Sequence, residues 1–121
     1  MAVHVRPEDA PRLALRGRDA TRLLEGDRYG VDMTVRLVEV PPEDPADPPR
    51  PPHVHDGAGE FIWVLEGHGM LHGAGGQFEV EAGEGVYVPA GERHKIAPED
   101  GQPLKLLCFF STGDVASCTR E

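Results

Sequence analysis

The segment His53-Val-His-Asp-Gly-Ala-Gly-Glu60 places two imidazoles and one carboxylate close together in the chain. Side chains at positions i and i+2 of a β-strand point to the same face, so His53 and His55 can reach one ion from one strand. The glycines between them and Glu60 suit a tight turn. Glu60 then begins Glu60-Phe-Ile-Trp-Val-Leu-Glu66, whose β-branched and aromatic residues predict a returning strand. We expect this hairpin to bring the carboxylate beside the two imidazoles.

A second segment, Gly83-Glu-Gly-Val-Tyr-Val-Pro-Ala-Gly-Glu-Arg-His94, supplies a third imidazole after a short strand and a turn. Three neutral imidazoles and one carboxylate form a donor set of intermediate hardness, which suits Fe²⁺, Zn²⁺, Mn²⁺, Ni²⁺, Co²⁺ or Cu²⁺. No cysteine lies at ligand spacing, so a closed thiolate zinc site is excluded. Four protein ligands leave coordination positions open, which is typical of catalytic sites. We predict one divalent transition metal, held by His53, His55, Glu60 and His94.

The two segments resemble the paired motifs of the cupin family. The first motif is matched by His53, His55, Glu60 and Gly67, and the second by Gly83, Pro89, Gly91 and His94. The glycine that opens the first motif is replaced by Asp47, and the asparagine that closes the second is replaced by Pro98. That asparagine is not a metal ligand in the family, so the ligand set is unaffected. The resemblance implies an all-β fold, a double-stranded β-helix or jelly-roll β-barrel.

Length and composition agree with such a fold. The 121 residues predict a single cupin domain over 1–121, with a polar leader at 1–11, a proline-rich surface loop at 41–52 and the two motifs at 53–98. The 15 glycines and 12 prolines are typical of many short strands joined by turns. Beyond the strands named above, further strands are predicted at residues 12–16, 20–24, 33–40, 69–72, 77–80 and 104–110. No helix longer than two turns is expected.

Charge and hydropathy exclude several classes of partner. The net charge of −9 argues against nucleic acid, whose phosphates require a basic surface. No apolar run approaches the roughly 20 residues of a membrane span, and the N-terminus lacks the apolar stretch of a secretory signal. Cys108 and Cys118 do not indicate a disulfide framework. We interpret both as reduced thiols of a cytoplasmic protein.

Strand alternation predicts which side chains surround the ion. Ile62 and Val64 fall on the metal face of their strand, and Ile96 shares the parity of His94. Phe61, Trp63 and Leu65 fall on the opposite face. The run 104–110 is nearly continuous in apolar residues, which favours burial on both faces. These apolar faces exceed what one small barrel can cover, so we expect a homodimer, with residues 12–24 as the segment that could be exchanged.

Two further residues are candidates for the pocket. Tyr87 offers a hydroxyl, although packing within its strand is the favoured interpretation. Arg36 offers a guanidinium fork that matches a carboxylate, although exposure on the outer face is favoured for it. His68 and His72 lie beyond the closing glycine of the first motif and are expected at the surface or rim.

Three functions remain open for a metal-binding cupin. The favoured one is an enzyme acting on a small organic substrate by oxygenase or dioxygenase chemistry, as the resemblance implies. The second is O₂-independent chemistry, in which the ion polarises a carbonyl for an isomerase, a polyketide-cyclase-like cyclase or a lyase. The third is a non-catalytic barrel that binds a small ligand. Neither the substrate nor the metal follows from the sequence, because the fold supports many reactions.

Overall fold

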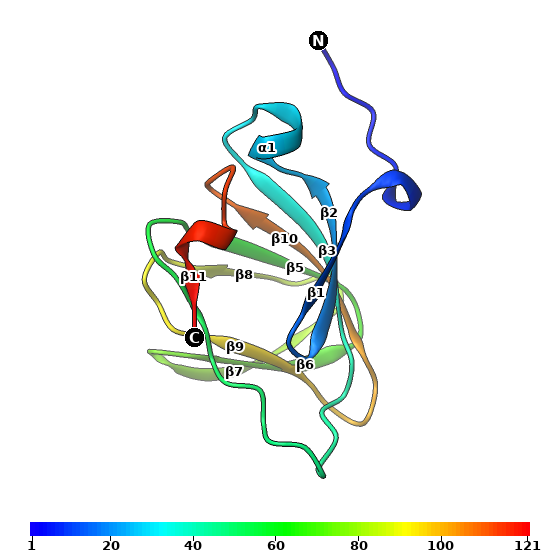
Figure 1. Ribbon diagram of the computed structural model, residues 1–121. Helices are drawn as coiled ribbons and strands as arrows, with labels where there is room; N and C mark the ends of the chain where they lie inside the picture. Colours follow the sequence, from blue (N-terminus) through cyan, green and yellow to red (C-terminus); the bar gives the residue numbers. More distant parts are fainter.

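The computed structural model describes residues 1–121, and nearly all of its regular structure is β-strand (Figure 1). The strands are β1 (Arg12–Leu15), β2 (Arg18–Leu24), β3 (Thr34–Val40), β4 (Val54–His55), β5 (Glu60–Glu66), β6 (His68–Gly73), β7 (Gly76–Glu81), β8 (Gly85–Val88), β9 (Lys95–Pro98), β10 (Leu104–Phe110) and β11 (Thr119–Arg120). The helical parts are the one-turn helix α1 (Gly26–Tyr29) and two 3₁₀ turns, η1 (Pro7–Asp9) and η2 (Ala116–Cys118). No helix is long and apolar enough to cross a membrane.

The strands form three antiparallel sheets that enclose one interior. The largest sheet has the order β1-β2-β3-β10-β5-β8, and smaller sheets have the orders β7-β6-β9 and β11-β4. Figure 1 shows the β6, β7 and β9 layer lying across from β5, β8 and β10. Strands distant in sequence are neighbours, since β10 pairs with β3 on one side and with β5 on the other. This arrangement confirms the predicted all-β architecture, and the expected strands are all present.

The core lies between the sheets and follows the two-residue alternation of the strands. Val64, Leu104 and Leu106 are almost completely buried there, and each such side chain contributes roughly 1.5–3 kcal/mol by leaving water. β10 alternates strictly, with its even-numbered residues buried and its odd-numbered residues partly exposed. The prediction that this strand is buried on both faces is therefore wrong, because the outer face of the large sheet has no second layer over it.

The outer face of β5 carries the three apolar side chains that its alternation predicted. Phe61, Trp63 and Leu65 are 37%, 37% and 39% exposed. Phe61 packs against Trp63 and against Phe109 of β10, with ring centroids 6.4 and 6.2 Å apart. The opposite face of β5 contributes Ile62 and Val64 to the interior, as expected.

Two segments differ from the expectation. The 41–52 loop is exposed for most of its length, but Arg50 within it is buried, with only 5% of its surface exposed. No strand was predicted in the polar C-terminal segment after residue 110, yet Thr119 and Arg120 form β11. This strand pairs with β4 so that Thr119 lies opposite His55. Both departures bring residues to the interior beside the predicted ligands.

Candidate metal centre

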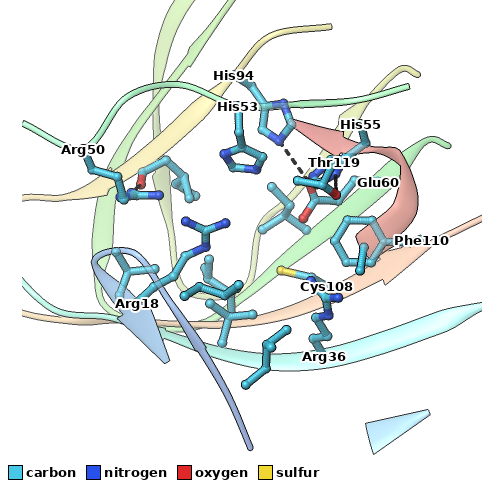
Figure 2. Close-up of a pocket in the computed structure, with 18 residues that line it drawn as sticks. Arg18, Arg36, Arg50, His53, His55, Glu60, His94, Cys108, Phe110 and Thr119 are labelled. Atoms are coloured by element: carbon cyan, nitrogen blue, oxygen red, sulfur yellow. Dashed lines mark hydrogen bonds and ion pairs between the residues drawn. The ribbon is translucent and has the colours of Figure 1, made fainter. Parts of the chain in front are cut away.

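Backbone pairing brings the four predicted ligands together. His53 and His94 form an isolated antiparallel bridge with two hydrogen bonds, from His53 N to His94 O at 2.9 Å and from His94 N to His53 O at 2.8 Å. His55 follows two residues later in β4, so its side chain shares the face of His53. Glu60 opens β5 after the turn, and its carboxylate points back toward the imidazoles. Figure 2 shows all four side chains facing one point at the end of a pocket.

The side-chain geometry is that of a compact donor cluster. One ligand atom from each of His53, His55, Glu60 and His94 lies within 4.8 Å of every other. Their ring centroids are 4.4 Å apart for His53 and His94 and 4.9 Å apart for His53 and His55. His55, Glu60 and His94 are buried, with at most 5% of their surface exposed. This cluster could hold one metal ion, as the sequence predicted.

A hydrogen bond from the C-terminal strand fixes the tautomer of His55. The Thr119 hydroxyl uses its only hydrogen to donate to the Val115 carbonyl, at 2.7 Å. At the 2.8 Å contact with His55 Nδ1, the hydroxyl oxygen must therefore accept, and Nδ1 must carry the ring hydrogen. The Nε2 lone pair of neutral His55 then faces the cluster, where it is buried without a hydrogen-bond partner. Outer partners of this kind orient metal-binding imidazoles.

The same reasoning applied to His94 indicates that a cation belongs in the cluster. His94 Nδ1 is 2.9 Å from the Glu92 carbonyl, which can only accept, so Nδ1 carries the hydrogen. In the neutral ring, the Nε2 lone pair would then face Glu60 Oε1 at 2.9 Å. The same oxygen is 3.3 Å from His55 Nε2. Three lone pairs converging in a buried site repel one another unless a proton or a metal ion lies among them, so the residues fit a divalent ion.

The pKa shifts agree with this arrangement. Burial, helped by the charges of His94 and Arg18, lowers the pKa of His53 to about 3, so this ring stays neutral and able to bind metal. Burial opposes ionisation of Glu60, but contacts with His55 and His94 outweigh it and hold the carboxyl pKa well below its usual range. Burial likewise opposes a charge on His94, yet Glu60 outweighs burial and raises the pKa of this imidazole. A proton on His94 Nε2 would therefore compete with a metal ion for the same lone pair.

The cluster opens on a cavity of about 280 Å³, near the lower end of the roughly 300–1,000 Å³ of small-molecule sites. Its walls are mainly apolar, and they include Ile62 and Ile96, which alternation had placed beside the ligands. Cys108 also lines the cavity, and burial followed by the charge of Glu60 raises its pKa well above the usual value. The thiol therefore stays protonated, as expected for a reduced buried cysteine.

The two candidate pocket residues have different positions. Arg36 was favoured for the outer face, and this is wrong: only 8% of its surface is exposed, and it lines the cavity. Arg36 lies two residues before the buried Val38 in β3, so the two side chains share the inward face of the strand. Tyr87 is 66% exposed on the outer face of β8 and does not line the cavity, because its strand parity is opposite to that of Val86 and Val88. His68 pairs with Asp100 at the surface, 3.0 Å away, as its rim position predicted.

Three residues beside the cluster were missed by the sequence analysis. Arg18 and Arg50 line the cavity together with Arg36, and Thr119 holds His55. Arg18 had a detectable signal, because it shares its strand face with the buried Ala20. Arg50 lies in a proline-rich loop without periodicity, and Thr119 lies in a short polar tail. Neither had a local pattern that could have revealed it.

Comparison with known proteins identifies the family. The family model of the cupin domain matches residues 36–110, which include all four candidate ligands. The chain belongs to the cupin family. A 56-residue stretch is 38% identical to an uncharacterised protein of Methanocaldococcus jannaschii, and this match covers 46% of the chain and 45% of that protein. The aligned part thus spans less than half of the curated relative.

Solved cupin structures share the fold. A sugar phosphate isomerase of the cupin superfamily from Silicibacter pomeroyi superposes with a TM-score of 0.71 at 23% identity, covering 90% of this chain and 75% of that one. A predicted oxalate decarboxylase from Thermotoga maritima superposes with a TM-score of 0.73 at 22% identity, covering 91% and 99%. At these identities the likeness establishes the cupin fold and leaves the reaction open.

Proposed function

We propose that this cupin is a metal-dependent enzyme that acts on a small organic molecule without consuming O₂, by isomerase or lyase chemistry. The observation that carries the proposal is the buried cluster of three imidazoles and one carboxylate at the end of a largely apolar cavity. Ligands of this kind, facing a cavity large enough for a small molecule, are typical of catalytic rather than structural metal sites.

The chain's own residues would prepare the site for such a reaction. His53, His55, Glu60 and His94 would hold the ion, and when bound it would supply a Lewis acid that polarises a carbonyl or carboxylate oxygen. The Thr119 hydroxyl and the Glu92 carbonyl each hold one imidazole in the tautomer that points Nε2 inward. The apolar walls exclude water, which strengthens electrostatic interactions inside the cavity.

The oxygenase favoured by the family resemblance is the alternative. The two solved neighbours described above are an isomerase and a predicted decarboxylase, and neither is described as an oxygenase. We therefore place the O₂-independent reaction first. The two reactions differ in one requirement that can be measured without knowing the natural substrate, namely the need for O₂.

The test uses metal-loaded protein and a panel of small keto acids and hydroxy acids in D₂O, under argon and under air, followed by ¹H NMR. Polarisation of a carbonyl should produce conversion, or deuterium exchange at the adjacent carbon, at equal rates under both gases. His55→Ala should remove the signal together with the metal. Conversion that requires air would support the oxygenase instead. Rates that are equal in wild type and His55→Ala would contradict a metal-dependent enzyme.

A further inference from the structure

The cavity beside the metal cluster is positively charged, although the chain as a whole carries a net charge of −9. Arg18, Arg36 and Arg50 line it, and the only carboxylate among the lining residues is Glu60. Three guanidinium groups and one carboxylate leave a net charge of +2 before any metal is bound. None of the three arginines forms an ion pair within the protein. Such a cavity attracts anions.

Arg50 is held in place by one donor and offers two others. Its Nη2 donates to the Ile96 carbonyl at 2.5 Å, which fixes the guanidinium against β9. Its Nε and Nη1 are buried without any hydrogen-bond partner, and only 5% of the residue surface is exposed. Buried polar groups are nearly always hydrogen-bonded in folded proteins. Two unpartnered donors on one fixed guanidinium therefore indicate a missing acceptor.

Gly17 explains how Arg50 reaches Arg18. This glycine lies in the turn between β1 and β2 with φ of 72°, and a Cβ there would be 2.9 Å from Arg50 Cδ. The absence of a side chain lets Arg50 lie over the turn, next to the residue that begins β2. Arg18 then points into the cavity between Arg50 and His53, as Figure 2 shows. Arg18 Nη1 donates a hydrogen bond to the Arg16 carbonyl at 3.3 Å.

The two guanidinium groups are neighbours of like charge, and neither forms a salt bridge, although the more distant carboxylates of Glu43 and Glu60 partly offset the charge of Arg50 and Arg18. Burial lowers the pKa of Arg50, and the positive charge of Arg18 lowers it further. Burial is also the main cause that lowers the pKa of Arg18. Arg36 lies on the other side of the cavity, with its guanidinium 5.4 Å from the centre of the Phe110 ring and its Nε unpartnered. Protein groups thus satisfy only part of the donor capacity on this side.

We propose that Arg18 and Arg50 bind the oxyanion group of an anionic substrate, a small organic molecule with a carboxylate or phosphate at one end and an oxygen that reaches the metal at the other. This inference deepens the proposed function and rests on it for the metal-bound end. Guanidinium forks match the spacing of carboxylate and phosphate oxygens, which supports both groups as ligands. The positive charge on the Arg36 side favours the same anion.

Isothermal titration calorimetry with inorganic phosphate and with malonate tests the proposal on metal-loaded protein. Arg18→Gln and Arg50→Gln should each weaken binding by about tenfold to hundredfold, because each removes a charge-assisted hydrogen bond. Arg16→Gln is the matched control, since Arg16 lies in the same turn but is exposed, 3.6 Å from Glu121. It should bind both anions within about twofold of wild type. The anion that binds more tightly identifies the oxyanion group.

Metal-free His55→Ala protein separates this inference from the proposed function. Phosphate should still bind there, and Arg18→Gln should still weaken it, even if the metal proposal fails. Arg18→Lys and Arg50→Lys, which keep the charge and guard against misfolding of the glutamine variants, should bind more weakly than wild type because the fork is lost. Unchanged affinity in all four arginine variants would overturn the inference. It would also be overturned if wild-type protein bound neither phosphate nor malonate at 10 mM, a concentration on the order of the weakest affinity worth assigning.

Discussion

Replacing Thr119 by valine tests how the C-terminal strand supports the metal centre. Valine keeps the shape of threonine but removes the oxygen that accepts from His55 Nδ1 at 2.8 Å. A buried donor left unpaired costs about 1–3 kcal/mol. The cost falls on the tautomer that presents Nε2 to the cluster, so the ring would shift its hydrogen toward the metal-binding nitrogen. We expect metal affinity to fall about tenfold to hundredfold, the range found when outer-shell partners are removed.

Competition against a fluorescent metal chelator measures this change. Thr119→Ser retains the hydroxyl and should bind metal like wild type. Thr112→Val is the matched control, because the Thr112 hydroxyl only accepts from the exposed Asp114 amide at 3.3 Å and touches no ligand. Wild-type affinity in Thr119→Val would refute the idea that this hydrogen bond sets the tautomer of His55. Equal losses in Thr119→Val and Thr112→Val would show a general effect of the substitution instead.

Three further predictions concern stability and assembly. Metal at 100 times its dissociation constant should add about 2.7 kcal/mol to the free energy of unfolding, so EDTA should lower the melting temperature at pH 7.5. The pKa of His53 is lowered to about 3 in the folded protein, so this residue contributes stability that is present above its unfolded pKa and lost as pH falls. The pKa of metal-free His94 is raised, so this residue stabilises the folded metal-free protein below its unfolded pKa. The His94 contribution makes the EDTA effect shrink toward pH 5, because a proton on metal-free His94 competes with the metal, whereas His53 is neutral at pH 5 with or without metal. An EDTA effect that grew on acidification would rule out histidine ligation. The exposed aromatic face of β5 should pair in a homodimer. Light scattering at tens of micromolar, on the order of a moderate dissociation constant, should report a dimer that Trp63→Glu disrupts and that the distant Phe78→Ser leaves intact. A wild-type monomer at this concentration would count against the dimer. Leu104→Ala, at a fully buried position, should lower the free energy of unfolding by urea by about 2–5 kcal/mol. A loss of about 0.5 kcal/mol or less, the size of a typical surface change, would argue against this core.

The sequence was informative where spacing fixes geometry. His53 and His55 share a strand face by the two-residue period, and the turn before Glu60 can only return the chain toward them. The same period placed Ile62 and Val64 inside and Trp63 outside. Such local rules are strong because a shift of one residue would move every side chain of the strand to the other face.

The sequence was less informative where the environment comes from distant segments. The run 104–110 is apolar except for Lys105, and only the bare outer face of the large sheet decides that its odd-numbered residues stay partly exposed. Arg36 was assigned outward because a cation rarely lies inside without a partner. It lies inside nonetheless, next to Phe110 and near two further arginines that the sequence does not place together. A set of this kind becomes visible only when the loop that carries Arg50 and the turn at Gly17 are seen side by side.

The central claim is that His53, His55, Glu60 and His94 hold one divalent ion, and metal content measures it most directly. Wild-type protein, His55→Ala, His94→Ala and the surface control His72→Ala should be expressed in metal-replete medium, purified without chelator and analysed by inductively coupled plasma mass spectrometry. The account predicts a near-equimolar transition metal in wild type and His72→Ala, with most of it lost from the two ligand variants. Undiminished metal in both His55→Ala and His94→Ala would contradict the assignment.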